Sequence, residues 1–212
     1  TVLSEIDHAL KHLKAWTRPA RVWTPITAQP GRSMIRPEPL GVVLIIAPWN
    51  YPFNLMITPL IGAIAAGNCA VLKPSEISAH TSRVIARLIP EFMDTDAIRV
   101  VEGAAETARE LLDQRFDHIF YTGGESVGRI VMKAAAEHLT PVTLELGGKS
   151  PAIIEAECDL GLAARRVAWG KFLNAGQTCI APDYVLVHRA HEDALVEKLA
   201  GVVGEFYGSD PG

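Results

Sequence analysis

The chain has 212 residues, of which 20 are basic and 24 acidic, so its formal net charge is −4. Hydrophobic residues make up 49% of the sequence and charged residues 21%, which is typical of a globular protein and excludes a disordered tail. The slight acidic balance gives no reason to expect a nucleic-acid partner. Three cysteines cannot close a complete disulfide framework, so we expect a reducing compartment, the cytoplasm.

The first 39 residues predict a helix followed by an extended arm. Residues 4–16 place apolar side chains on one helical stripe. Residues 17–39 contain five prolines, a spacing that forbids a long helix and suits an extended segment or an edge hairpin. The longest apolar stretch, residues 40–47, is too short to span a bilayer.

From residue 40 onward, predicted strands alternate with predicted helices. The strands are 40–47, 69–72, 98–101, 119–121 and 142–146, and the helices are 53–66, 78–92, 106–112 and 126–138. This order predicts an α/β fold with a doubly wound parallel sheet, with helices on both faces. A second α/β unit follows, with strands at 151–154 and 183–188, helices at 160–173 and 191–206, and a polar loop at 174–182.

Polar and glycine-rich residues gather after the predicted strands, where parallel sheets bind ligands. Gly123 and Gly128 enclose a turn into a helix, and glycines at a helix start let a phosphate approach closely. The same spacing also suits an ordinary helix-start turn. Lys73 and Glu76 are placed to bind the hydroxyls of a ribose, or they form a solvated ion pair at a helix start capped by Ser75 or Ser78.

Three residues are candidates for catalysis. Cys179 lies in the polar loop, where an accessible thiolate would be a strong nucleophile, although a half-buried loop cysteine is an equal alternative. Glu145 ends an apolar strand, so we expect a partly desolvated carboxylate that serves as a general base, or else a cap or salt bridge. The amide of Asn50 can donate to an oxyanion or simply form a turn.

The other cysteines and the histidines give weaker signals. Cys69 sits in an apolar strand and is expected to be inert core, and the acidic neighbours of Cys158 disfavour a thiolate. The spacings Glu5-x-x-His8 and His188-x-x-His191 are isolated pairs, and two ligand residues do not make a metal site, so we expect none.

Taken together, five sequence strings resemble the aldehyde dehydrogenase superfamily. They are Pro48-Trp-Asn-Tyr-Pro52, Lys73-Pro-Ser-Glu76, Tyr121-Thr-Gly-Gly-Glu-Ser-Val-Gly128, Leu144-Glu-Leu-Gly-Gly-Lys-Ser-Pro151 and Gly176-Gln-Thr-Cys179. Residues 138–145 and 176–184 look most like the class-three branch, dimeric enzymes that act on fatty and aromatic aldehydes. The resemblance spans nearly all of residues 1–208.

The resemblance implies a Rossmann-like NAD(P)-binding domain at 1–146 and the beginning of a catalytic domain at 147–212. It implies that Cys179 attacks the aldehyde, that the Asn50 side chain and the Cys179 N–H hold the oxyanion, and that Glu145 activates water. The implied cofactor is NAD or NADP. The residues implied to bind it are Pro48, Trp49, Lys73, Ser75, Glu76, Gly123, Gly124, Ser126, Gly128, Leu146 and Gly147.

The resemblance also implies a hydrophobic aldehyde as substrate and a homodimer in which the arm at 17–39 meets the partner subunit. The chain is about half the length expected of the family, so we expect a piece of a dehydrogenase that binds NAD weakly and turns over poorly in isolation. The choice between NAD and NADP, and a membrane anchor beyond residue 212, stay open.

Three other functions remain possible from the residues. The first is a hydrolase or acyl transferase with a cysteine nucleophile, for which His188 would be the nearest histidine in sequence after Cys179. The second is an NAD-binding fragment without activity. The third is an acyl-CoA-forming relative, although the carboxylate of Glu145 favours water as the final acceptor.

Overall fold

The computed structural model describes residues 1–208, and the chain divides into two compact units, residues 1–146 and 147–212. The first element, α1 (Val2–Trp16), begins at Thr1, whose hydroxyl accepts a hydrogen bond from the amide of Ser4. This helix packs along α2 (Asn54–Ala65). Only part of the expected stripe is covered, because Leu10 and Trp16 stay exposed.

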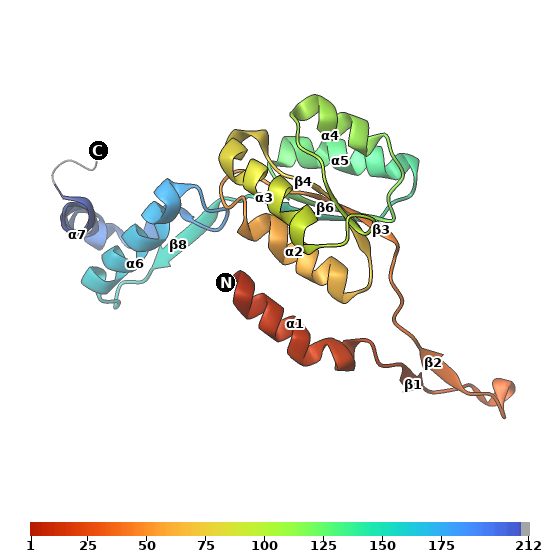
Figure 1. The fold of residues 1–212 in the computed structure, drawn as a ribbon. Helices are drawn as coiled ribbons and strands as arrows, with labels where there is room; N and C mark the ends of the chain where they lie inside the picture. The colour runs from red at the N-terminus through yellow and green to blue at the C-terminus, as the bar shows by residue number, and fades with distance from the viewer. Residues whose placement is uncertain (209–212) are drawn as a thin grey trace. The chain divides into compact units, whose positions relative to one another are not determined.

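The proline-rich segment forms a hairpin. Strands β1 (Ala20–Val22) and β2 (Ser33–Ile35) pair antiparallel, and a short 3₁₀ helix, η1 (Ile26–Ala28), lies in the connection between them. Figure 1 shows this hairpin extending from the end of α1, away from the central sheet. All three residues of β1 are exposed, so the hairpin has no core of its own.

The centre of the first unit is a five-stranded, fully parallel sheet. Its strands are β3 (Val42–Ile46), β4 (Cys69–Lys73), β5 (Ile98–Val100), β6 (His118–Gly123) and β7 (Val142–Leu146), in the spatial order β5-β4-β3-β6-β7. The chain winds outward from β3 to β5, returns to β6 on the other side of β3, and ends at β7. The predicted doubly wound α/β fold is therefore confirmed.

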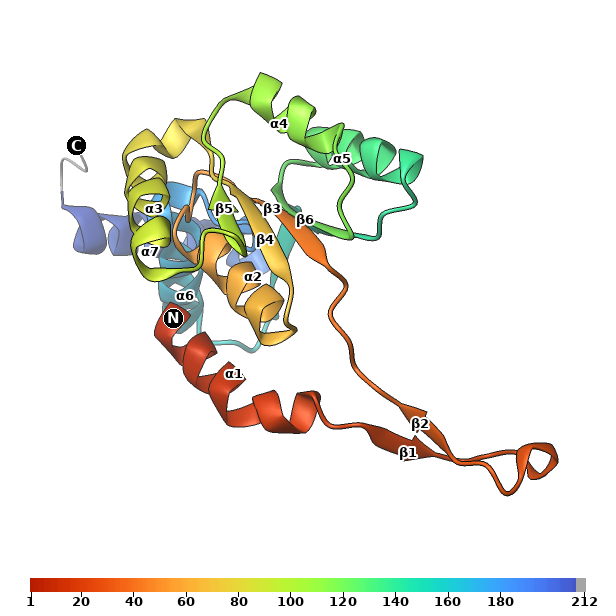
Figure 2. The same cartoon turned by 45° about the vertical axis from the view of Figure 1, so that its right-hand side comes forward.

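Helices cover both faces of this sheet, as Figure 2 shows. On one face, Val43 and Ile45 join α2 and α3 (Ala79–Phe92) in one apolar core. On the other face, Leu44 joins residues of α4 (Ala105–Leu112) and α5 (Glu125–Glu137) in a second core. A strand buried on both faces must be apolar at every position, and this explains the continuous β-branched run that begins the sheet.

The second unit repeats the strand–helix pattern on a smaller scale. Strands β8 (Ser150–Ile154) and β9 (Pro182–Val187) pair in parallel. Helix α6 (Leu160–Phe172) starts at Asp159, whose carboxylate accepts from two backbone amides, and α7 (Glu192–Tyr207) closes the unit. Its core consists of Ile154, Ala164, Ala168, Leu195 and Val202.

Within residues 1–208 no helix combines the length and the apolar character needed to cross a membrane.

Candidate active site

A cleft of about 330 Å³ opens in the first unit where β3, β4 and β6 end. The register aligns Ile46 of β3 with Lys73 of β4 and Tyr121 of β6, so the carboxyl ends of these strands lie level. The winding direction reverses between β3 and β6, and this switch point is where open parallel sheets bind ligands. Seven of the predicted cofactor-binding residues line the cleft, namely Pro48, Trp49, Lys73, Ser75, Glu76, Gly123 and Gly124.

One wall of the cleft carries an ion pair. Lys73 is the last residue of β4; its ammonium lies 3.5 Å from the Glu76 carboxylate and donates to the carbonyl of Pro74 at 2.9 Å. The side chain of Lys73 is only 4% exposed, whereas that of Glu76 is 48% exposed. The ion pair of the alternative interpretation is therefore present at a helix start, but only its glutamate is solvated, because the lysine is buried at the end of a central strand.

Ser75 fixes the chain between these two charged residues. Its hydroxyl accepts from the amide of Ile77 and caps the 3₁₀ turn η2 (Glu76–Ser78). Its carbonyl accepts from the hydroxyl of Ser82 at 2.7 Å. These bonds hold Glu76 at the mouth of the cleft, with its carboxylate partly open to a ligand.

The opposite wall is the glycine turn between β6 and α5. The hydroxyl of Tyr121 donates to the carbonyl of Gly124 at 3.1 Å. A Cβ on Gly123 would lie 2.2 Å from that hydroxyl oxygen, so only glycine fits there without displacing the buried tyrosine. Burial also raises the pKa of Tyr121, while the bond to Gly124 opposes that shift. The phenol is thus a fixed hydrogen-bond donor that supports the turn.

Gly128, expected beside a pyrophosphate, has a packing reason for being glycine. A Cβ there would lie 3.0 Å from a methyl carbon of Leu146 and 3.5 Å from the ring of Tyr121, so its absence lets α5 approach the sheet closely. Neither Gly128 nor Leu146 lines the cleft, and Ser126 is exposed outside it. Gly147 belongs to the second unit. Cofactor contacts at these four positions stay predictions.

Small and aliphatic side chains form much of the remaining cleft wall. They are Ala104, just before α4, and Ala105, Ala108, Leu112, Val127 and Ile130 of α4 and α5. A flat apolar ring fits between such walls, while the Lys73–Glu76 pair offers a donor and an acceptor for ribose hydroxyls. The residues present therefore fit the adenosine part of a dinucleotide.

Among the cleft residues that the sequence analysis did not predict as site residues are Tyr121 and Arg109. It placed Tyr121 at the end of a strand and in one of the five family strings, and Arg109 in a short helix. Their placement depends on which helices flank the switch point, and spacing along the chain does not give that. A signal did exist for Tyr121, because a phenol in a buried strand needs a polar partner.

Two predicted catalytic residues belong to the first unit. Asn50 lies in the turn between β3 and α2, and the oxygen of its side-chain amide is buried. Glu145 lies in β7, opposite Thr122 in the register, and its side chain is exposed. The expected desolvation of this carboxylate is wrong for the described residues, because β7 is the last strand of the sheet. The catalytic roles of both residues stay predictions.

Cys179 belongs to the second unit and is exposed. It follows the 3₁₀ segment η3 (Leu173–Gly176), where Asn174 and Ala175 have φ angles of 52° and 54°. Non-glycine residues rarely adopt this left-handed conformation, which costs about 1 kcal/mol or more and is concentrated at functional sites. The amide of Gln177 donates to the carbonyl of Asn174 at 3.1 Å. A strained turn therefore presents the accessible thiol.

The remaining cysteines differ in exposure. Cys158 is exposed as well, and Cys69, expected in the core, is only partly buried at the first position of β4.

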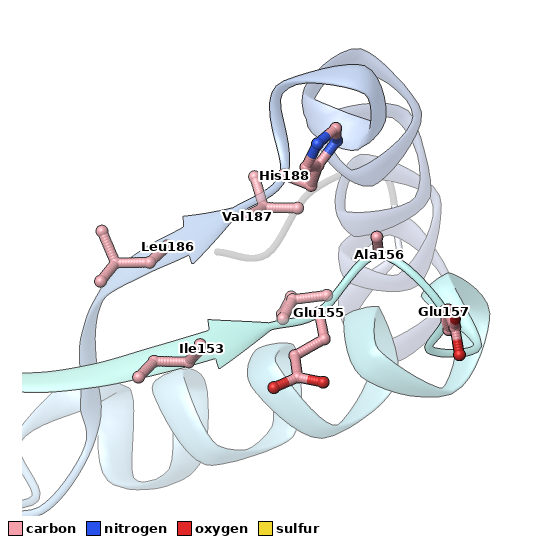
Figure 3. A pocket seen from close by; sticks show the side chains of 8 residues that line it. Ile153, Glu155, Ala156, Glu157, Leu186, Val187 and His188 are labelled. Atoms are coloured by element: carbon pink, nitrogen blue, oxygen red, sulfur yellow. The ribbon is translucent and has the colours of Figure 1, made fainter.

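A second hollow of about 510 Å³ lies beyond the carboxyl ends of β8 and β9. Figure 3 shows Ile153 and Leu186 along the strands, with Glu155 and His188 where the strands end. The hollow is wide open, and it is lined by His188, the histidine considered above for a hydrolase, but by none of the residues predicted for dehydrogenase catalysis or cofactor binding.

A doubly wound parallel sheet with an apolar cleft at its switch point defines the first unit as an α/β domain of the nucleotide-binding class. The family model described as the aldehyde dehydrogenase family matches residues 2–211. The chain therefore belongs to the aldehyde dehydrogenase family, as its five sequence strings predicted.

Over the aligned residues, curated relatives are about half identical to this chain. It is 54% identical over 210 residues to "Aldehyde dehydrogenase family 3 member A2" of Macaca fascicularis, covering 99% of this chain and 43% of that protein. It is 53% identical over 209 residues to "Aldehyde dehydrogenase, dimeric NADP-preferring" of Rattus norvegicus, covering 99% of this chain and 46% of that protein. The predicted likeness to the class-three branch is confirmed.

Solved structures agree with this assignment. A structure described as the substrate-bound state of Staphylococcus aureus AldH is 51% identical, with a TM-score of 0.95, and the match covers 99% of this chain and 46% of that one. An NAD-dependent aldehyde dehydrogenase from Sinorhizobium meliloti is 34% identical, with a TM-score of 0.84, over 95% of this chain and 40% of that one. The chain thus spans less than half the length of the relatives it matches.

Proposed function

We propose that this chain contributes the cofactor cleft and the nucleophile of an NAD(P)-dependent enzyme that oxidises a hydrophobic aldehyde to a carboxylic acid. The observation that carries the proposal is that one chain of this family contains both features the chemistry needs. The first unit has a switch-point cleft suited to adenosine, and the second unit has an exposed cysteine after a strained turn. Named relatives include an NADP-preferring enzyme and an NAD-dependent one, which supports NAD or NADP as the cofactor.

Each predicted residue has one chemical task. The thiolate of Cys179 attacks the carbonyl carbon, because hydride can leave only after that carbon becomes tetrahedral. The side-chain amide of Asn50 and the backbone N–H of Cys179 donate to the oxyanion that forms. When bound, NAD or NADP accepts the hydride. Glu145 then takes a proton from water, which attacks the thioester carbon and releases the acid and the thiolate.

The residues of the cleft hold the cofactor. Glu76 accepts hydrogen bonds from ribose hydroxyls and Lys73 donates to them, while the aliphatic residues of α4 and α5 enclose the adenine. The glycine turn at 123–124 leaves room for the phosphates beside the first amides of α5.

Substitution of the nucleophile tests the proposal. In the purified protein, Cys179→Ala should lower aldehyde-dependent NADH formation by about 10³-fold or more, because no other group forms the covalent adduct. Glu145→Gln should spare the first burst of NADH and slow steady turnover. Cys158→Ser is the matched control, since Cys158 is also exposed and has no assigned task. Dehydrogenase activity retained by Cys179→Ala would contradict the mechanism.

The homodimer, in which the β1–β2 hairpin meets the partner subunit, and the cytoplasmic location are further parts of this proposal. Exposed apolar side chains on the hairpin, such as Ile26 and Ile35, support the subunit contact. Sedimentation of the protein with and without Ile35→Lys tests it, because a charge at that contact should shift a dimer toward monomer.

A further inference from the structure

The turn that presents Cys179 is short and is held where it ends. The amide of Ala181 donates to the carbonyl of Thr178 at 3.0 Å. This hydrogen bond encloses Cys179 and Ile180 in a tight turn. Ala181 is only 7% exposed, whereas Ile180 is 78% exposed and Cys179 is exposed as well. The direction of the thiol therefore depends on how the chain is anchored just after the turn, where β9 begins.

Strand β9 begins with an irregularity. In its register with β8, Ser150 lies opposite Pro182, and the next residue of β8 lies opposite Tyr184. Asp183 is therefore an extra residue of β9, as in a β-bulge, which turns a side chain out of the regular alternation. Helix α6 approaches this point closely, since a Cβ on Gly170 would lie only 3.3 Å from the Cδ of Pro182. The chain after the turn thus packs against α6 at Pro182 and departs from the regular ladder at Asp183.

The extra residue is tied to the start of β8 by an ion pair. The carboxylate of Asp183 lies 3.1 Å from the ammonium of Lys149, the residue that directly precedes β8. The side chain of Asp183 is 33% exposed and that of Lys149 is 80% exposed. A pair so open to water contributes little to global stability, so the effect of its loss should be confined to the neighbouring chain. That chain includes the turn of Cys179.

We propose that Lys149 and Asp183 are positioning residues for Cys179. Their ion pair holds the bulge closed, and the bulge fixes the direction in which the turn at 178–181 presents the thiol to the aldehyde carbon. Both residues act through the backbone, and neither needs to touch the substrate. A displacement of a reacting atom by about 1 Å can cost about 100-fold in rate, so a loosened turn should slow the attack. This inference rests on the proposed function, since it assumes that Cys179 is the nucleophile.

The first test removes the charge of Asp183 and keeps its shape. In the purified protein mixed with NAD and hexanal, Asp183→Asn should slow the first burst of NADH by about 10-fold, because nucleophilic attack must precede hydride transfer. The KM for NAD should stay within about twofold, since the cleft of the first unit is unchanged. The midpoint of urea unfolding should hardly change, because an exposed ion pair contributes little to stability.

Exchange of the two charges tests whether the pair itself acts. Lys149→Asp brings two carboxylates together and should slow the burst at least as much as Asp183→Asn does. The double variant Lys149→Asp/Asp183→Lys restores a pair of opposite charges. Its burst rate should return to within about threefold of that of the unchanged protein.

Glu205→Gln is the matched control. Its carboxylate pairs with Arg165, also within the second unit, and the two side chains are 55% and 50% exposed. This pair links α6 to α7 rather than β8 to β9. The variant should therefore keep the burst rate within about twofold of that of the unchanged protein.

The outcomes distinguish this inference from the proposed function. An unchanged burst rate in Asp183→Asn would overturn the positioning role, while loss of activity in Cys179→Ala would still support the nucleophile. An equal loss in Glu205→Gln, or no recovery in the double variant, would overturn it too. Absence of a burst in the unchanged protein would contradict the proposed function itself. Hydrogen exchange at the Ala181 amide then decides the inference: faster exchange in Asp183→Asn than in Glu205→Gln supports it, and equal exchange overturns it.

Discussion

The ammonium of Lys73 lies 3.5 Å from the carboxylate of Glu76 on one wall of the cleft, with the lysine buried and the glutamate half exposed. Loss of the carboxylate charge leaves a buried cation whose ammonium still donates to the Pro74 carbonyl. We expect Glu76→Gln to lower the free energy of unfolding by about 1–2 kcal/mol, less than for a fully buried pair because water screens Glu76. Urea unfolding measures the change.

Glu106→Gln serves as the comparison for this measurement. Its carboxylate lies 3.9 Å from Arg109, and both side chains are largely exposed, so the change should stay within about 0.5 kcal/mol. Equal losses in the two variants would show that burial of Lys73 does not strengthen its pair.

Two adjacent glycines in the turn after β6 should respond differently to a methyl group. A Cβ on Gly123 would lie 2.2 Å from the hydroxyl oxygen of Tyr121, which is buried and cannot move freely. Gly123→Ala should therefore lower the free energy of unfolding by about 1–3 kcal/mol. At Gly124, within the part of the chain that the structure describes, a Cβ would meet nothing within 4 Å, and its φ of −76° suits any residue.

Gly124→Ala should consequently change stability by less than about 0.5 kcal/mol. Thermal unfolding of both variants without ligand checks the pair. The proposed packing of Tyr121 is wrong if Gly123→Ala unfolds at the same temperature as Gly124→Ala.

Alkylation should rank the three cysteines by exposure. Cys179 and Cys158 are exposed and Cys69 is partly buried. Brief treatment of the native protein with iodoacetamide should modify Cys179 and Cys158 first, and Cys69 only slowly. Peptide mass spectrometry gives the rate at each site. Loss of activity should follow the modification of Cys179, and activity retained after Cys179 is fully alkylated would refute this assignment.

His118 should make the protein less stable in mild acid. Burial lowers the pKa of this imidazole below its ordinary value of 6.5, and its Nε2 lies 3.1 Å from the hydroxyl of Thr143. Between the lowered pKa and 6.5 the unfolded chain binds more protons, so the free energy of unfolding falls as the pH falls through that range. Above pH 6.5 the contribution of His118 is constant.

We therefore expect the unchanged protein to lose more stability than His118→Gln when the pH falls from about 7.5 to about 5. Denaturant unfolding at both pH values measures the difference, and other titrating groups cancel in the comparison. Parallel losses in the two proteins would contradict the partial burial of the His118 imidazole.

Most of the sheet could be predicted from the sequence, because residues 40–47 are apolar on both faces and each later strand is separated from the next by an amphipathic helix. The convergence of Lys73, Glu76 and Gly123 on one cleft also follows from the sequence. They end or follow parallel strands, whose carboxyl ends share one edge.

Other features of the site depend on spatial order, which spacing along the chain does not give. Arg109 reaches the cleft because α4 lies on the same face of the sheet as α5, next to the switch point. The apolar residues around Glu145 in the sequence predicted a desolvated carboxylate. The exposure of this side chain depends instead on its strand being the last of five. The sequence also does not predict the left-handed turn at Asn174 and Ala175, because no hydrophobic pattern or motif requires positive φ angles there.

The indole of Trp49 lines the cleft and is 42% exposed, whereas Trp16 and Trp23 lie on α1 and after β1. Among the described tryptophans of the first unit, only this one would change its surroundings from water to a nucleotide. Trp49 can therefore serve as an intrinsic fluorescence probe. Its emission should fall as a ligand enters the cleft, so the occupancy of the cleft can be followed without a label.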